Sequence, residues 1–175
     1  IQHKREQTNN TAVKRRYQAM KILLKSLLLI IYSVCLSAAA AQGSTEDEQR
    51  QAILAVADAF FEALANRDRA GLEAILVPGS LNIATSQSAD GETNYSIRDY
   101  QEMVSSLSRP GGSRTERYWD ATVLIRGDIA VFWAPYDFHV EGVLTHCGID
   151  SFQLVKRQGQ WLLSNLSWTI EPSGC

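Results

Sequence analysis

The sequence predicts an α+β domain in which three helices precede an antiparallel sheet. Apart from one short alternating segment, apolar residues between positions 45 and 107 recur every three or four residues, as in amphipathic helices. After Gly112 apolar and polar residues alternate, which is typical of strands. Three glycine-containing turns divide this second part into consecutive hairpins. One domain with its helices first therefore explains the pattern most simply.

The first predicted helix covers residues 45–65. Thr45 and Glu48 have the spacing of a capping box, and acidic side chains suit the first turn of a helix. Apolar residues then follow at helical spacing: Ile53, Val56, Ala57, Phe60 and Leu64. The polar run 66–68 interrupts this pattern and predicts the end of the helix.

Two shorter helices are predicted after this break. Asp68 is the expected N-cap of the second helix, which the pair Pro78-Gly79 should end. The third is expected to begin after Ser96, with Asp99 at the capping distance. The breaker run 109–112 should end it.

The strands come mainly from the second half of the chain. Residues 81–85 alternate as a short strand, and the turn Asp90-Gly91 predicts a return strand over 92–95. After Gly112 the alternation resumes and predicts an antiparallel meander. Its predicted hairpin turns are Gly127-Asp128, Glu141-Gly142 and Gln158-Gly159.

The beginning of the chain predicts a targeting segment. Residues 20–41 combine lysines, an apolar core and a small-residue cleavage pattern near Ala41, which are the three parts of a secretory signal peptide. The alternative is an uncleaved membrane anchor, but roughly a dozen apolar residues fall short of the about 20 needed to span a bilayer. We therefore expect residues 1–19 to be an upstream extension, residues 42–175 to be the domain, and the mature protein to be secreted or periplasmic.

The charges of the chain are segregated. Of 17 basic and 19 acidic residues, seven basic and one acidic fall within 1–41, so residues 42–175 carry a net charge of −8. An acidic body has no electrostatic footprint for nucleic acid or anionic lipid. We expect no nucleic-acid partner, and membrane contact only through the transient signal peptide.

Three segments of the domain resemble a known superfamily. They are AFFEALANRDRAGLEAIL, GDIAVFWAPYDFHVEG and SFQLVKRQGQWLLSNLSW. Together with the order of predicted elements, they are similar to the nuclear transport factor 2-like superfamily, which includes the SnoaL-like polyketide cyclases, ketosteroid isomerase and scytalone dehydratase. The resemblance implies a strongly curved sheet wrapped around the helices as an open cone, often dimeric through the outer face of the sheet.

The resemblance does not identify a reaction, because this scaffold carries enzymes, binders and adaptors. Where ketosteroid isomerase has its oxyanion-binding Tyr, this chain has Phe60 and Phe61, which cannot donate a hydrogen bond. Steroid-isomerase chemistry is therefore not expected.

One candidate catalytic pair follows from the predicted register. If Glu141-Gly142 forms a two-residue turn, Asp137 lies opposite His146 on the neighbouring strand. A carboxylate beside an imidazole suits general acid–base catalysis. The alternative is a charge pair on the outer face, and a bulge at Pro135 would move Asp137 to the other face.

Aromatic residues on the predicted strands give a candidate ligand site. Trp133 and Tyr136 flank the Asp137 pair, and the same register places Trp133 opposite Asp150. Together with Trp119, these residues are predicted to bind a small, partly apolar molecule. The alternative is that these rings pack against the helices.

The remaining reactive residues predict a disulfide and no cofactor. Cys147 and Cys175 leave the mature chain with an even number of cysteines in an oxidising compartment, which favours a bond between them. Asp137, His139, His146 and Asp150 lack the spacing of a known metal motif. We expect neither a metal nor another cofactor.

Three functions remain open on the sequence alone. The first is an exported binding domain for a small, partly apolar molecule. The second is a cyclase, isomerase or dehydratase type of enzyme, with His146 as the general base and Asp137 orienting it. The third is an interaction subunit that forms a homodimer through the outer sheet face.

Overall fold

The computed structural model describes residues 45–88 and 90–175. The chain divides into two compact units, Ile1–Asp47 and Glu48–Cys175. The predicted extension 1–19 and signal peptide 20–41 lie outside the described residues. Among the residues that are described, no helix is both long enough and apolar enough to cross a bilayer.

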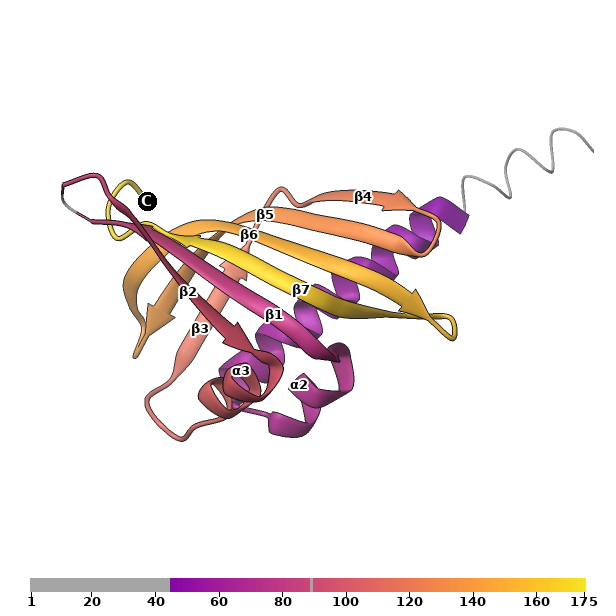
Figure 1. The fold of residues 1–175 in the computed structure, drawn as a ribbon, viewed down its shortest axis with the longest axis horizontal. Coiled ribbons are helices and arrows are strands. Elements are labelled where there is room, and N and C mark those ends of the chain that lie inside the picture. The colour runs from indigo at the N-terminus through magenta and orange to yellow at the C-terminus, as the bar shows by residue number, and fades with distance from the viewer. Residues whose placement is uncertain (1–44, 89) are drawn as a thin grey trace, which may run out of the picture. The chain divides into compact units, whose positions relative to one another are not determined.

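The second unit contains helices and one seven-stranded sheet (Figure 1). A long helix covers residues 45–66 of the described chain. The elements that follow are α2 (Arg69–Ile75), β1 (Leu76–Gln87), β2 (Thr93–Asp99), α3 (Tyr100–Leu107), β3 (Arg114–Tyr118), β4 (Thr122–Arg126), β5 (Ile129–Val140), β6 (Val143–Arg157) and β7 (Gln160–Ile170). The strand order is β2-β1-β7-β6-β5-β3, and β4 also pairs with β5. The sheet is therefore open, with β2 at one edge and β3 and β4 at the other.

The α+β class is confirmed, but the prediction of a wholly antiparallel sheet is wrong. The sheet is mixed rather than wholly antiparallel, because β1 and β7 pair in parallel. This difference arises because β1 pairs with the last strand, β7, as well as with β2. Parallel neighbours cannot be connected by a tight turn, and here the whole β2–β6 segment connects β1 to β7. In the chain α3 lies between β2 and β3, after the two strands that were predicted over 81–85 and 92–95.

Two element boundaries also differ from the predictions. The second helix ends at Ile75, and β1 continues through Pro78-Gly79, where Gly79 has a φ of +92° and the pairing with β7 shifts register. The third helix begins at Tyr100. Asp99, rather than Ser96, is its N-cap, because the Asp99 carboxylate accepts from the Glu102 N–H at 2.9 Å and Glu102 accepts from the Asp99 N–H at 3.1 Å.

All three predicted hairpin turns of the meander are confirmed. They join β4 to β5, β5 to β6 and β6 to β7 through two residues each. Glu141 and Gly142 both have positive φ, at 52° and 76°, and Gln158 and Gly159 have 52° and 83°. Two central residues with positive φ give a turn whose twist matches that of the sheet.

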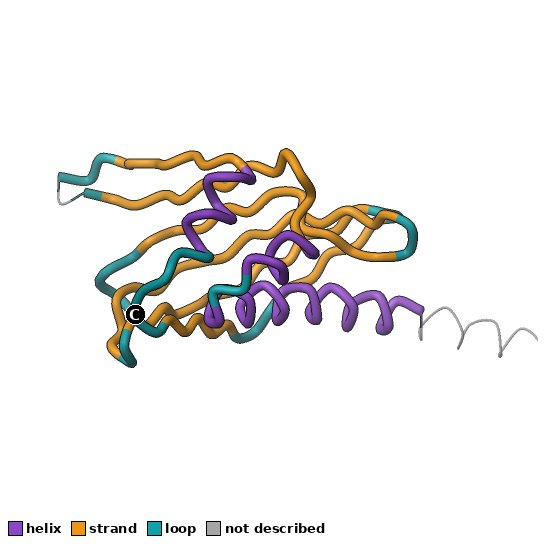
Figure 2. Tube along the Cα trace, turned by 90° about the horizontal axis from the view of Figure 1, so that it is seen from below, coloured by secondary structure: helices purple, strands orange, loops and turns teal. Residues whose placement is uncertain are grey.

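The core lies between the helices and one face of the sheet, against which the helices gather (Figure 2). On β5, even-numbered side chains from Ala130 to Tyr136 are buried there, and odd-numbered ones face the other way. Phe132 packs at 5.1 Å between ring centres against Phe152 of β6, which contacts Phe60 of the long helix at 5.3 Å. The aromatic rings therefore join the helices to the sheet.

Candidate functional site

A cavity of about 200 Å³ opens beside this core, between the helices and the inner face of the sheet. Its wall is mostly apolar, with a smaller polar part. The apolar part includes Phe60, Leu64, Met103, Leu107, Phe138 and Trp168. The polar part includes Arg98, Arg114, Glu116, Tyr136, His146 and Asp150.

Strand alternation brings two acidic side chains to this cavity from either side of β5. Glu116 of β3 lies opposite Phe138, and Asp150 of β6 lies opposite Ala134. Both Phe138 and Ala134 belong to the inward-facing set of β5. Side chains directly opposite one another share a face, so Glu116 and Asp150 also point inward.

The two acids form a buried carboxyl pair. Asp150 is only 2% exposed, and its carboxyl interacts with that of Glu116. Burial raises the pKa of Asp150 to about 7. Burial first, and then the charge of Asp150, raises the pKa of Glu116 well above its ordinary value. The pair therefore holds a proton at neutral pH, because two adjacent carboxylates in a poorly solvated site cannot both stay charged.

Two polar atoms on the cavity wall are buried without a partner among the described residues. They are Oδ2 of Asp150 and Nε of Arg114. The Arg114 guanidinium also donates from Nη2 to the Leu107 carbonyl at the end of α3. A buried polar atom without a hydrogen bond is costly, so both positions favour a polar group placed in the cavity.

Three further polar side chains of the wall are Tyr136, His146 and Arg98. The Tyr136 hydroxyl donates to the Thr169 carbonyl at 2.7 Å, and burial raises the pKa of that phenol. Burial lowers the pKa of His146, which keeps the imidazole neutral at neutral pH. Arg98 reaches the cavity from the edge strand β2.

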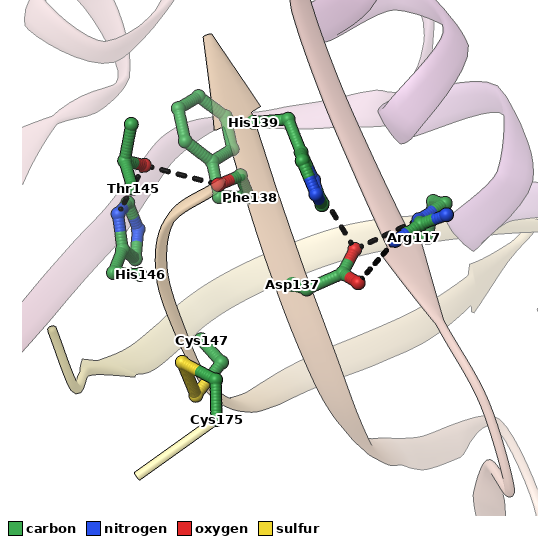
Figure 3. Close-up of polar contacts among 8 residues, drawn as sticks. All are labelled: Arg117, Asp137, Phe138, His139, Thr145, His146, Cys147 and Cys175. Carbon is green, nitrogen blue, oxygen red and sulfur yellow. Dashed lines mark hydrogen bonds and ion pairs between the residues drawn. A yellow bond between two sulfur atoms is a disulfide. The ribbon is translucent and has the colours of Figure 1, made fainter. Parts of the chain in front are cut away.

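The predicted pairing of Asp137 with His146 is wrong. The register follows the predicted turn as far as His139 and Leu144 and then shifts, so that Phe138 lies opposite His146 and Asp137 opposite Cys147. Thr145 is the extra residue, and its hydroxyl donates to the Phe138 carbonyl at 3.0 Å and lies 2.9 Å from Nδ1 of His146 (Figure 3). The bulge is therefore on β6, not at Pro135.

Asp137 instead joins a cluster on the outer face. Its carboxylate accepts from Nε of Arg117 at 2.9 Å and also from Nη2, and His139 Nδ1 lies 3.5 Å away (Figure 3). The Arg117 hydrogen bonds hold the pKa of Asp137 below its ordinary value. Asp137 and His146 consequently belong to opposite faces of the sheet and cannot act together.

The predicted ligand-binding residues divide between the two faces. Tyr136 and Asp150 line the cavity. Trp133 lies opposite Ser151 rather than Asp150, because of the same one-residue shift. Trp133 and Trp119 are 49% and 46% exposed and are absent from the cavity wall. They therefore do not line this cavity, and their role in binding a ligand stays a prediction.

The predicted disulfide between Cys147 and Cys175 is present (Figure 3). Cys147 also exchanges two backbone hydrogen bonds with Glu171, just beyond β7. The bond therefore attaches the end of the chain to β6. Within residues 45–88 and 90–175, no three metal-binding side chains come together.

Sequence reasoning missed Arg98, Arg114 and Glu116. Arg114 and Glu116 are two apart, so alternation places them on one face of β3. That signal could have been found. The face of β3 that points inward is set by its pairing with β5, about 20 residues later in the chain. No hairpin turn joins these two strands, so the sequence does not predict their register.

The carboxyl pair predicts an unusual pH dependence of stability. The pKa of Asp150 rises from 3.8 to about 7 on folding, so the folded chain binds more protons than the unfolded chain between these pH values. This contribution to the free energy of unfolding is complete below about pH 4 and is lost as the pH rises through about 7. Urea unfolding from pH 4 to 8 should show the stability of wild type relative to Asp150→Asn falling by on the order of a few kcal/mol.

The matched control is Asp137→Asn. The pKa of Asp137 is lowered on folding, so its contribution has the opposite sign and is lost as the pH falls below its ordinary value. A stability difference between wild type and Asp150→Asn that stays flat from pH 4 to 7 would contradict a buried, proton-holding Asp150.

No family model and no curated protein matches the chain. Solved structures do match it. A protein of unknown function from Mycobacterium tuberculosis has a TM-score of 0.62 and 11% identity, covering 75% of this chain and 80% of its own. An NTF2-like protein from Cytophaga hutchinsonii has a TM-score of 0.58 and 21% identity, covering 70% and 98%. A nuclear transport factor 2-like superfamily protein from Salmonella enterica has a TM-score of 0.58 and 13% identity, covering 74% and 94%. At these identities the likeness defines the fold.

Proposed function

The domain has the nuclear transport factor 2-like fold, and we propose that it belongs to an exported protein and binds a small, partly apolar molecule in the cavity beside Asp150. The observation that carries this proposal is the unpartnered Asp150 Oδ2, which is buried on the wall of that cavity. A ligand that bonds to this atom would remove the cost of leaving it unpaired.

The shape of the cavity supports a ligand of about one ring. Its volume of about 200 Å³ is somewhat above the roughly 150 Å³ of an engineered cavity that binds benzene. Aromatic and aliphatic side chains form most of the wall, and the polar groups are few and gathered on one side. This is the usual composition of small-molecule sites.

The disulfide supports the proposed export. Cys147 and Cys175 are bonded, and structural disulfides form and persist mainly in oxidising compartments outside the cytosol. The acidic charge of residues 42–175 fits a domain that binds neither nucleic acid nor anionic membranes.

Blocking the cavity should abolish binding. Ser96 lies on the cavity wall and is exposed, so Ser96→Trp should fill the opening without disturbing the core. Saturation-transfer NMR with a library of monocyclic fragments should detect binders of wild type that lose their signal with Ser96→Trp. Ser113→Trp, at an exposed position that does not line the cavity, is the matched control and should keep binding these fragments. Fragments that bind both variants equally would place binding elsewhere and contradict the proposal.

A second candidate function is acid–base catalysis, and the Glu116–Asp150 pair favours it. A carboxyl with a pKa of about 7 in a cavity is suited to moving protons at neutral pH. The pair would replace Asp137 and His146 as the catalytic groups. Cyclohexanone in D2O, followed by NMR, gives a direct test: an enzyme should speed deuterium exchange next to the carbonyl, and Asp150→Asn should not. Equal exchange rates with wild type and Asp150→Asn would contradict catalysis by the carboxyl pair and leave ligand binding as the function.

A further inference from the structure

The polar part of the cavity wall contains two arginines and one carboxyl pair. The titratable and charged groups that share this wall with Asp150 are Arg98 of β2, Arg114 and Glu116 of β3, Tyr136 of β5 and His146 of β6. The side chains that the long helix, α3, β1 and β7 contribute to the wall are uncharged. With His146 neutral and one proton on the carboxyl pair, the wall has one positive charge in excess.

This charge favours an anionic ligand over a cationic one. Arg114 provides a second argument, because its Nε is a buried donor without a partner among the described residues. Burial and the nearby Arg67 lower the pKa of Arg114, although a guanidinium remains protonated in proteins. An acceptor atom of an anion would satisfy Nε, and the planar donors of arginine match a carboxylate.

An anion would also face Asp150 Oδ2. Two carboxylates cannot share a buried site unless a proton lies between them. A protonated Asp150 would donate from Oδ2 to one ligand oxygen, while the other oxygen accepts from Arg114 Nε. With one proton on Asp150, the ligand carboxylate can form hydrogen bonds with both Asp150 Oδ2 and Arg114 Nε, the two atoms that otherwise lack a partner among the described residues of the wall.

We propose that the ligand of this cavity is a small monocarboxylic acid of about one ring, bound as the carboxylate together with one proton taken up by Asp150. This inference rests on the proposed binding function and adds the ligand class and the proton. The proton comes from solvent, and no covalent bond changes.

Three probes of one size test the proposal: benzoate, benzamide and benzylamine. Isothermal titration calorimetry at pH 6 and pH 8 should show benzoate binding about tenfold more weakly at pH 8, because Asp150 must first be protonated there. Benzamide should bind without this pH dependence, and benzylamine should bind more weakly than benzoate at pH 6. Titrations at pH 8 in phosphate and in Tris should give an uptake of nearly one proton for each benzoate bound.

Asp150→Asn is the sharpest variant. An amide N–H can donate to the benzoate carboxylate at any pH. The variant should therefore bind benzoate equally at pH 6 and pH 8 and take up no proton on binding. If the variant does not fold, the comparison of probes and buffers in wild type remains decisive.

The outcomes separate this inference from the function on which it rests. Binding of benzamide or benzylamine in preference to benzoate, or benzoate binding without proton uptake, would overturn the inference and leave small-molecule binding intact. If no probe or monocyclic fragment bound, the proposed function itself would fail.

Discussion

Replacing Phe132 with alanine is expected to lower the free energy of unfolding by about 3–5 kcal/mol, the usual loss for a large aromatic residue removed from a core. Phe132 is 0% exposed and packs on Phe152 and on Tyr118, each at 5.1 Å between ring centres. Because it does not line the cavity, its removal tests the packing of the helices on the sheet and not the site. Urea unfolding followed by circular dichroism measures the change.

Trp133→Ala is the control for Phe132→Ala. The two residues are adjacent on β5 and face opposite sides of the sheet, and Trp133 is about half exposed. Its replacement should change the free energy of unfolding by less than about 1 kcal/mol. Comparable losses for the two variants would mean that the inward and outward faces of β5 are assigned incorrectly.

The second large effect is expected from the disulfide. Cys147 and Cys175 are 28 positions apart, and closing a loop of that length in the unfolded chain stabilises the folded state by about 3–4 kcal/mol in the chain-entropy model. Cys175→Ser should remove most of this stabilisation, because Cys175 is exposed and serine adds no buried polar group. Thermal unfolding of the variant, and of wild type with and without reductant, measures the loss.

The double variant Cys147→Ala/Cys175→Ser provides the check on this interpretation. Once the bond is gone, removing its second sulfur should cost little more, so the double variant should resemble Cys175→Ser. Reductant should not affect either variant. Wild type that unfolds at the same temperature with and without reductant would show that the bond does not stabilise the fold.

Local features of the sequence predicted the meander well. Each of the turns Gly127-Asp128, Glu141-Gly142 and Gln158-Gly159 contains a glycine with positive φ and has alternating strands on both sides. Such hairpins depend only on neighbouring residues. The resemblance to the superfamily agrees with the fold that the solved structures define. The disulfide was predicted from the even number of cysteines, and in the structure β7 brings the end of the chain back to Cys147.

What could not be predicted depends on contacts between distant segments. The parallel pairing of β1 with β7 joins residues about 80 positions apart, and no turn announces it. At the third helix Ser96 was predicted as the N-cap, but Asp99 is the N-cap because β2 pairs with β1 as far as Asp99.

The candidate site shows the same limit at a single residue. The extra residue at Thr145 shifts the register of β6 by one, which separates Asp137 from His146 and moves Trp133 away from Asp150. A one-residue shift changes the cross-strand partner of every following side chain. The two strands were therefore predicted correctly, but the pairing of Asp137 with His146 was not. Glu116 and Asp150 meet only because β3 and β6 flank β5, and this follows from the sheet order and not from any motif.

Ligand binding, acid–base catalysis and proton-linked uptake of a carboxylic acid all depend on the carboxyl pair facing the cavity. Carbon-13 NMR of the side-chain carboxyls, titrated in wild type, Glu116→Gln and Asp150→Asn, tests the pair directly. We expect a carboxyl of the pair to titrate near pH 7 in wild type and each substitution to remove the coupling between the two groups. Two carboxyls that titrate independently near pH 4 would show that Glu116 and Asp150 are solvated and apart, and would contradict the proposed site.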